Sequence, residues 1–391
     1  MYTLDELRPV WAEIDLDNLA HNIREVRKHT DKNSLVTAVV KANGYGHGSV
    51  EISRTFLENG ADRLAVAVLT EAIELRNKGI DAPILVMGYT PPGLYEKAIE
   101  YDIILTIYNL KDAIALSDQA RVMGKDAVIH IKIDSGMGRI GFLADEKSTE
   151  SILKIWKLPS INIEGIFTHF AKADELDKKH AKGQYEKFSN LIKELEANGL
   201  KIPIKHSSNS AAIIDLPDYN MNMVRGGIMI YGLYPSDEVN RESIILKPAM
   251  TLKTRISHLK AVPKGTGISY GQIFVTEKDS VIGTLPIGYA DGYTRMLTGK
   301  GEVYVNGKRA KIVGKICMDQ CMVDVSHIDD IKVGDEVVLF GYGREGYPHV
   351  DEIAEKLGTI NYEVVCMVSR RVPRVYISNG KIVNIRDYLL D

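Results

Sequence analysis

The sequence predicts an α/β protein with a (β/α)8 barrel at residues 1–242 and a mostly β C-terminal domain at residues 243–391. Two observations predict this arrangement. In the first part of the chain, eight short apolar runs alternate with segments of helical periodicity, which favours a parallel sheet with helical crossovers. After about Ser243, strand-like runs follow one another without long helices, which favours an antiparallel β domain.

The runs expected to form the barrel strands are residues 36–40, 64–68, 84–87, 103–107, 128–133, 161–167, 202–205 and 221–224. Several helical segments between them, such as "LTEAIELRNKG", end on glycine, a common helix stop. Eight such units favour a closed barrel of the TIM type, whereas six or seven would form an open, doubly wound sheet.

The second domain carries two hairpin signals. Asn306-Gly307 and Asn379-Gly380 each lie between two extended runs, which is typical of a tight β-turn. One helix is expected at residues 350–358. The segment at residues 10–16 precedes the first barrel unit, has an extended pattern and is a candidate to pair with this second domain.

Composition excludes several classes of protein. With a formal net charge of -3 and a pI of about 6.4, the chain gives no electrostatic reason to bind nucleic acid or an anionic membrane. It has no apolar run long enough to span a membrane and no apolar leader, so we expect a cytoplasmic protein. Its three cysteines predict no disulfide framework, and the spacing of Cys317 and Cys321 lacks the second pair that a zinc site needs.

The unusual polar residues follow the ends of different predicted strands. They are Lys41 after the first, Lys132, Asp134 and Arg139 around the fifth, His169 after the sixth, His206, Asn209 and Ser210 after the seventh, and Arg225, Gly226 and Gly227 after the eighth. In a barrel these ends share one face, where barrel enzymes place their sites and where the last two strands commonly bind phosphate. A lysine, other cations and a phosphate-binding site at one face suggest pyridoxal phosphate, because its phosphate is anionic and its aldehyde condenses with an amine.

Several motifs, in order and over essentially the whole chain, resemble the alanine racemase family, fold-type III enzymes that use pyridoxal phosphate. They are "VVKANGYGHG", "IKIDSGMGRIGF", "GIFTHFAKADE", "SNSAA", "ISYG", "PIGYADGY", "ICMDQCMVD" and "TINYEV". The resemblance implies a barrel followed by a β domain. It also implies a homodimer whose active sites take residues from both subunits.

The resemblance implies a racemase that interconverts L-alanine and D-alanine through an external aldimine of pyridoxal phosphate, supplying D-alanine for peptidoglycan. Lys41 would anchor the cofactor and serve as one base, and Tyr270 of the partner subunit would be the second. Because tyrosine is a poor base at neutral pH, nearby cations are expected, and the implied chain runs from Tyr270 through His169 to Arg225.

The resemblance assigns further roles. The implied cofactor contacts besides Lys41 are Tyr45, His169, Asn209, Ser210, Arg225, Gly227, Ile228 and Tyr362. Arg225 would face the pyridine nitrogen and, because arginine keeps its proton, would leave that nitrogen unprotonated. This arrangement favours return of the proton to Cα over transamination. His206 would buttress Arg225.

Arg139 and Met318 would bind the substrate carboxylate, with Asp319 beside Met318. Tyr289 and Tyr362 would narrow the entrance so that a methyl side chain fits. Lys132 is implied to be carbamylated and to bridge to Arg139; alternatively it is a plain lysine that pairs with Asp134. Three positions depart from the family pattern: Gly226, where we expect a looser turn, Lys172 and Gly44.

Other functions stay open at this stage. A racemase of the same fold could act on serine or lysine, and a related enzyme could decarboxylate basic amino acids, although "ISYG" and "ICMDQCMVD" speak against the latter. A non-catalytic carrier of pyridoxal phosphate would not need Tyr270 or a second domain. A dinucleotide-binding oxidoreductase is disfavoured because "GYGHGS" has Ser49 at the position of the third glycine.

Overall fold

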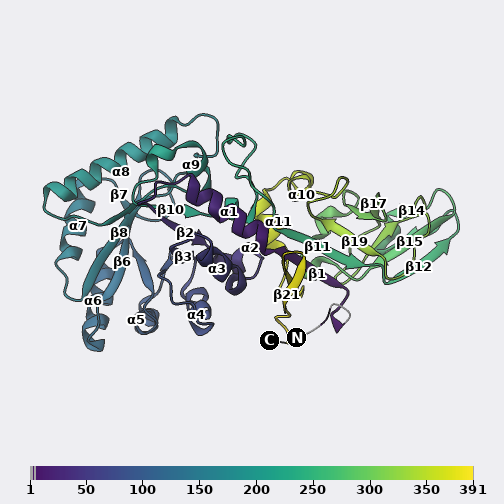
Figure 1. Ribbon diagram of the computed structural model, residues 1–391, viewed down its shortest axis with the longest axis horizontal. Coiled ribbons are helices and arrows are strands. Elements are labelled where there is room, and N and C mark those ends of the chain that lie inside the picture. The colour runs from purple at the N-terminus through teal and green to yellow at the C-terminus, as the bar shows by residue number, and fades with distance from the viewer. Residues whose placement is uncertain (1–2, 4–5, 391) are drawn as a thin grey trace. The chain divides into compact units, whose positions relative to one another are not determined.

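The computed structural model describes residues 3 and 6–390 and forms two compact units (Figure 1). The barrel unit comprises Leu19–Gly44 and Ser49–Lys247. The β unit comprises Met1–Asn18, Tyr45–Gly48 and Pro248–Asp391. The short segment Tyr45–Gly48 therefore belongs to the β unit although it lies between two stretches of the barrel sequence.

The barrel unit is built on eight strands in the described part of the chain, paired in the order β10-β2-β3-β4-β5-β6-β8-β9. They are β2 (Leu35–Val39), β3 (Arg63–Val66), β4 (Ile84–Val86), β5 (Ile104–Ile107), β6 (Ala127–Asp134), β8 (Ile161–Phe167), β9 (Ile204–His206) and β10 (Met223–Gly226). A short strand, β7 (Phe142–Leu143), pairs with the end of β6. Every recorded pairing in this set is parallel, so the predicted eight-unit barrel is confirmed.

The barrel is nearly closed between β9 and β10. Here the backbone N–H of Asn222 donates to the carbonyl of Lys205 at 3.0 Å, and that of Arg225 donates to Ser208 at 3.1 Å. The strands read as apolar runs because helices cover them on the outside, as Figure 1 shows, and each β4 residue is fully buried or nearly so.

The helices are α1 (Leu16–Lys28), α2 (Lys41–Tyr45), α3 (Ser49–Glu58), α4 (Leu69–Asn77), α5 (Tyr95–Glu100), α6 (Leu110–Met123), α7 (Glu146–Trp156), α8 (Lys179–Ala197) and α9 (Ser210–Asp215). Their ends follow local chemistry. For example, the side chain of Asn109 accepts from the N–H of Asp112 at the start of α6, and Gly124 ends that helix at a φ of 63°. Within the described residues, none of the helices is both long enough and apolar enough to cross a bilayer.

The β unit contains a sheet of ten strands among the described residues, in the order β12-β15-β18-β17-β16-β19-β11-β1-β20-β21. They are β1 (Val10–Asp15), β11 (Met250–Arg255), β12 (His258–Val262), β15 (Ser280–Leu285), β16 (Glu302–Val305), β17 (Lys308–Val313), β18 (Cys321–Asp324), β19 (Glu336–Phe340), β20 (Arg374–Ser378) and β21 (Lys381–Arg386). A separate pair is formed by β13 (Gly267–Ile268) and β14 (Phe274–Val275). Strand β1 lies between β11, which is antiparallel to it, and β20, which is parallel.

Both predicted hairpins are confirmed. Asn306-Gly307 joins β16 to β17, and Asn379-Gly380 joins β20 to β21, with positive φ at all four residues. The helix expected at residues 350–358 is α10 (Val350–Leu357), which Gly358 ends at a φ of 70°. A second helix, α11 (Asn361–Met367), follows it directly and was not predicted.

Candidate active site

Lys41 follows β2 and begins an unusual turn. The φ angles of Ala42, Asn43 and Gly44 are 53°, 53° and 61°, so the chain turns in the left-handed sense, which non-glycine residues adopt at a cost. Two side chains hold this turn within the barrel unit. Glu71 accepts from the N–H of Ala42 at 2.6 Å, and Asn43 accepts from the N–H of Ser49 at 3.1 Å.

Arg225, at the end of β10, is buried with 3% of its surface exposed. Its Nη1 donates to Nδ1 of His206 at 2.7 Å, and its Nη2 donates to the carbonyls of Thr168 and Ser207 at 2.9 and 2.8 Å. Nη2 also lies 3.3 Å from Nδ1 of His169. In the described chain its hydrogen-bond partners are thus histidine nitrogens and carbonyl oxygens rather than a carboxylate. Burial and the nearby charge of Arg139 lower the pKa of Arg225 to about 9.

A buried chain of hydrogen bonds continues from Arg225 across the barrel. Nε2 of His206 lies 2.9 Å from Nδ1 of His130, and Nε2 of His130 lies 2.9 Å from Oε2 of Glu164. Glu164 also accepts a bidentate pair from Arg63, at 2.6 and 2.9 Å. Burial raises the pKa of Glu164, but the hydrogen bonds from His130 and Arg63 outweigh it and lower the pKa to about 2. This carboxylate is therefore ionised.

The two ends of this chain fix its direction. Arginine only donates and a carboxylate only accepts. Burial lowers the pKa of both His130 and His206, so both rings are neutral. His206 must accept at Nδ1 from Arg225, carry its proton on Nε2 and donate to His130. In turn His130 carries its proton on Nε2 and donates to Glu164.

Sequence reasoning missed His130, Glu164 and Arg63. Two signals were present. His130 alternates with Lys132 on β6 and so lies on the same face. Gly165 is an isolated glycine inside β8, and a Cβ there would lie 2.5 Å from the ring of His130, so the glycine makes room for the imidazole.

His169 follows β8, and its ring faces several cations of the barrel. Burial, then the charges of Arg225, Arg139, Lys132 and Lys41, hold the pKa of His169 well below its usual value. The ring is therefore neutral. Because Nδ1 faces the donor-only Arg225, the proton belongs on Nε2.

Lys132 is 3% exposed on β6, and its Nζ donates to the carbonyl of Ile133 at 2.5 Å. Asp134 does not form an ion pair with Lys132 in the described structure. Instead, its carboxylate accepts from the N–H groups of its own loop, residues 136–139, at 2.9 to 3.1 Å. Burial and the charge of Arg225 lower the pKa of Lys132 from 10.5 to about 7. A neutral amine is the form that reacts with carbon dioxide, so this environment suits the implied carbamylation.

The depressed pKa of Lys132 predicts a pH-dependent stability difference between the wild type and Lys132→Met. Between pH 7 and 10.5 the unfolded chain holds a proton on this amine that the folded chain has lost, so the wild type gains about 1.4 kcal/mol of unfolding free energy per pH unit in this window. The methionine variant has no such proton. We expect it to be the more stable protein at pH 6 and to lose that advantage by pH 10.

Urea unfolding in buffers free of carbon dioxide, from pH 6 to 10, measures this difference. Lys205→Met is the control, because Lys205 lies in the same barrel sheet, on β9, and forms an ion pair with Glu196. A constant difference between the wild type and Lys132→Met across this range would contradict the prediction.

The ends of β9 and β10 provide donors for an anion. Ser210 is 4% exposed at the start of α9, and its Oγ accepts from the N–H of Gly227 at 3.0 Å. Asn209 caps the same helix by accepting from the N–H of Ala212 at 3.1 Å. Ile228, buried, follows Gly227. The barrel thus brings a hydroxyl and backbone N–H groups together where the sequence predicts a phosphate site.

The donor set fits pyridoxal phosphate. Within the barrel unit, the charges of Lys132, Arg139 and Arg225 disfavour one another, and the nearby carboxylate of Asp134 is already used by its own loop. An anionic ligand would relieve this repulsion. Lys41 adds an amine that can bond to an aldehyde.

The three departures have local explanations. A Cβ at Gly226 would lie 2.7 Å from Cγ2 of Ile230, so the glycine permits close packing at this turn. A Cβ at Gly44 would lie 2.2 Å from Cδ1 of Ile52. Lys172 forms an exposed ion pair with Glu175 at 3.1 Å.

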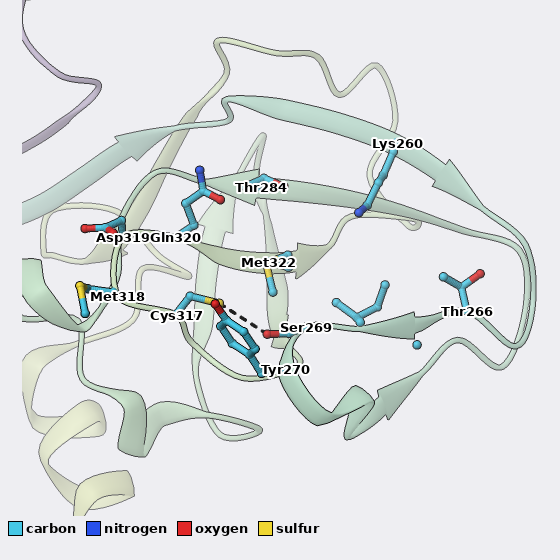
Figure 2. Close-up of a pocket in the computed structure, with 12 residues that line it drawn as sticks. Lys260, Thr266, Ser269, Tyr270, Thr284, Cys317, Met318, Asp319, Gln320 and Met322 are labelled. Atoms are coloured by element: carbon cyan, nitrogen blue, oxygen red, sulfur yellow. Dashed lines mark hydrogen bonds between the residues drawn. The ribbon is translucent and has the colours of Figure 1, made fainter.

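In the β unit, Tyr270 lines a cavity of about 630 Å³ and is 71% exposed. Figure 2 shows Met318 and Asp319 toward one end of this cavity and Lys260 toward the other. Ser269 precedes Tyr270 at a φ of 66°, and its hydroxyl donates to the carbonyl of Lys315 at 2.7 Å. This contact fixes the turn that presents Tyr270.

The predicted entrance residue Tyr289 lies on a loop that packs against Met318. The N–H of Tyr289 donates to the carbonyl of Cys317 at 3.1 Å. In the same loop, the fully buried Asp291 accepts from Arg8 at 2.5 and 2.8 Å and lies 3.5 Å from Nε of Arg371. Arg371 also pairs with Asp319 at 2.8 Å. These contacts tie the Tyr289 loop to the Met318–Asp319 loop.

Two further predicted residues, Tyr45 and Tyr362, lie together in the β unit. Their ring centroids are 6.2 Å apart, and Tyr45 is 7% exposed. Burial raises the pKa of Tyr45 well above its usual value, so its hydroxyl keeps its proton. The two tyrosines therefore lie as a pair, and the protonated hydroxyl of Tyr45 can donate a hydrogen bond.

Comparison with known proteins supports a common ancestry for both units. The alanine racemase N-terminal domain model matches residues 14–235, and the C-terminal domain model matches residues 249–376. The alanine racemase of Clostridium tetani is 55% identical over 384 residues, 98% of this chain and 99% of that protein. A solved alanine racemase of Clostridium difficile, 47% identical, covers 98% of this chain and 99% of its own with a TM-score of 0.95.

The chain joins a barrel, with a lysine just after its first strand, to this β unit, and alanine racemases match it over nearly its full length. It is therefore an amino-acid racemase, an isomerase. The chain belongs to the alanine racemase family. The same fold also serves another substrate, since a histidine racemase from Leuconostoc mesenteroides is 28% identical over 95% of this chain, with a TM-score of 0.88.

Proposed function

We propose that this protein interconverts L-alanine and D-alanine with pyridoxal phosphate as its cofactor. It acts as a cytoplasmic homodimer and supplies D-alanine for peptidoglycan. The observation that carries the proposal is the buried Arg225, a donor-only group held by histidines and carbonyls. It lies at the end of β10, which pairs with β2, the strand that Lys41 follows. The full-length match to alanine racemases supports the substrate.

The chain supplies two proton carriers for this reaction. When bound, pyridoxal phosphate withdraws electrons from an amino acid and makes its Cα hydrogen acidic. Lys41 anchors the cofactor and carries a proton on one face of Cα. Tyr270 of the partner subunit carries a proton on the opposite face, so removal on one side and return on the other invert the configuration.

Arg225 holds its proton toward the pyridine nitrogen. The hydrogen-bond chain to Glu164 supports this role, because His206 presents only a lone pair to the guanidinium. A group that keeps its proton at neutral pH leaves the ring nitrogen unprotonated, which limits how far electrons are withdrawn from Cα. Proton return at Cα is then favoured over transamination.

His169 supports the second base. Its proton lies on Nε2 because Nδ1 faces Arg225, so Nε2–H is a donor that can stabilise the phenolate oxygen of Tyr270 of the partner subunit. A hydrogen bond to the charged form favours that form.

The remaining roles follow the resemblance. We propose that Ser210, Asn209 and the N–H groups of Gly227 and Ile228 hold the phosphate together with the hydroxyls of Tyr45 and Tyr362. Arg139 and the backbone of Met318 bind the substrate carboxylate, with Asp319 orienting the latter. Carbamylated Lys132 braces Arg139. Tyr289 and Tyr362 limit the size of the side chain.

Removal of the phenolic oxygen in Tyr270→Phe tests the two-base proposal. We expect the rate of D-alanine formation from L-alanine to fall by about 10²- to 10⁴-fold, the usual contribution of one acid–base group. Coupled enzymatic detection of D-alanine with purified protein measures it. Tyr304→Phe is the control and should keep the wild-type rate, because Tyr304 lies in the same unit but packs edge to face against Tyr347 and does not line the cavity.

Two results would overturn parts of this proposal. Normal racemisation by Tyr270→Phe would refute the second base while leaving the family intact. A wild-type protein that binds pyridoxal phosphate but forms no D-alanine would refute the substrate. Assays with serine, lysine and histidine would then identify the substrate, since a relative of the same fold is a histidine racemase.

A further inference from the structure

The turn after Lys41 continues into a longer left-handed segment. Besides residues 42–44, Tyr45 and Gly46 have φ angles of 50° and 81°. Five consecutive residues therefore adopt a conformation that persists only where the surroundings hold it. The part of this segment in the β unit, Tyr45–Gly48, carries one predicted phosphate contact, Tyr45.

Arg374 on β20 is the group that holds this segment in the β unit. It is fully buried and is the largest fully buried side chain of the described residues. Its Nε donates to the carbonyl of Gly46 at 2.8 Å. Its Nη1 donates to the carbonyls of Ser369 and Val372, both at 2.5 Å, and its Nη2 donates to that of Val368 at 2.7 Å. The guanidinium also faces the ring of Tyr388 at 5.6 Å.

The carbonyls that Arg374 binds lie in the two segments that carry the predicted phosphate-binding tyrosines, Tyr45 and Tyr362. Gly46 follows Tyr45 directly, and Val368 and Ser369 follow the end of α11, which carries Tyr362. Gly46 also packs closely on this helix, since a Cβ there would lie 2.3 Å from the carbonyl oxygen of Val365. One guanidinium thus joins the loop of Tyr45 to the helix of Tyr362.

We propose that Arg374 is a positioning residue that clamps the Tyr45–Gly48 loop onto the end of α11 and so orders the Tyr45–Tyr362 pair that receives the cofactor phosphate. The proposal deepens the proposed function and rests on it for the identity of the ligand. A forked side chain is required, because four carbonyls in different directions are bound by the Nε, Nη1 and Nη2 donors of one planar group. Lysine has a single compact ammonium that cannot reach all four.

Arg374→Lys tests the clamp in the holoenzyme. We expect pyridoxal phosphate to dissociate about tenfold faster on dilution, the effect of about one lost charged hydrogen bond. We also expect faster hydrogen–deuterium exchange at the peptides covering residues 44–48 and 361–369. Dissociation is followed by the absorbance of the bound cofactor and exchange by mass spectrometry.

Arg309→Lys is the matched control. Arg309 belongs to the same unit and also ties a loop by donating to carbonyls, those of Gly346 at 2.8 Å and Tyr347 at 3.1 Å. Its loop lies outside the predicted site. We expect this variant to keep the wild-type dissociation rate and the wild-type exchange at residues 44–48 and 361–369.

The outcomes separate the clamp from the proposed function. Wild-type dissociation and exchange in Arg374→Lys would overturn the clamp. If the wild type binds no pyridoxal phosphate, the proposed function fails, and exchange at the two segments still decides whether Arg374 holds them. If Arg374→Lys unfolds globally, Gly46→Ala decides, because its added Cβ displaces the same loop from α11; an unchanged exchange pattern there would refute the proposal.

Discussion

The Lys41→Ala variant is expected to form no measurable D-alanine and to lose the visible absorbance of a lysine-bound cofactor. The reason is twofold. The amine both anchors the cofactor and carries one of the two protons, and either role alone is worth orders of magnitude in rate. The side chain begins the left-handed turn, but the turn is held through Glu71 and Asn43, so we expect the fold to persist.

Lys172→Ala is the control for this experiment. Lys172 lies in the same barrel unit, after β8, but only forms an exposed ion pair with Glu175. Its removal should leave racemisation unchanged. A Lys41→Ala protein with normal circular dichroism that still racemises alanine would show that another group carries the cofactor.

The second large effect is expected for Arg225→Glu, which replaces the hydrogen-bond donor at the end of the buried chain with an acceptor. A carboxylate at this position accepts from Nδ1 of His206, so the protons of His206 and His130 must both move to Nδ1. Nε2 of His130 would then direct a lone pair at the carboxylate of Glu164. We expect a loss of about 3–5 kcal/mol of unfolding free energy and a fall in racemase rate of a hundredfold or more.

The chain predicts that a second substitution partly repairs the first. Glu164→Gln can donate its amide to Nε2 of His130 and so accommodates the reversed direction. Alone, it should destabilise the protein by about 1–3 kcal/mol, because one amide N–H then faces Arg63. Combined with Arg225→Glu, it should recover stability, giving a favourable coupling in a double-mutant cycle measured by urea unfolding.

Asp215→Asn provides the matched control for this cycle. Asp215 is another mostly buried carboxylate of the barrel unit, paired with Lys178 at 2.6 Å and outside the chain. It should show no coupling with Arg225→Glu. Coupling of equal size for both pairs would mean that loss of negative charge, rather than donor direction, explains the repair.

The barrel could be predicted closely from the sequence because its strands are buried on both faces. A strand such as β4, Ile84–Val86, has no polar face and reads as an uninterrupted apolar run between helical segments. The placement of Lys41, His169 and Arg225 at strand ends followed from the same pattern, since each comes within two residues of the end of a predicted strand.

The β unit was harder to predict because its pairings are far apart in the sequence. The two hairpins were visible, since a local turn sets their register. The extended pattern of residues 10–16 correctly indicated pairing with this unit, but the choice of β11 and β20 as its neighbours, and the inclusion of Tyr45–Gly48, depend on contacts that no local pattern encodes. The helix α11 was hidden because its short length leaves too few turns to show periodicity.

The place of β1 also constrains how the chain acquires its fold during synthesis. Val10–Asp15 leaves the ribosome well before both of its neighbours, since the antiparallel one includes Met250 and the parallel one includes Arg374. Until those residues are made, the strand has two open edges, which are the surfaces through which nascent chains associate wrongly. The barrel sequence is made in this interval, whereas the β sheet can close only after β20 has been made. A chain released before β11 is made would therefore expose β1 without either neighbour.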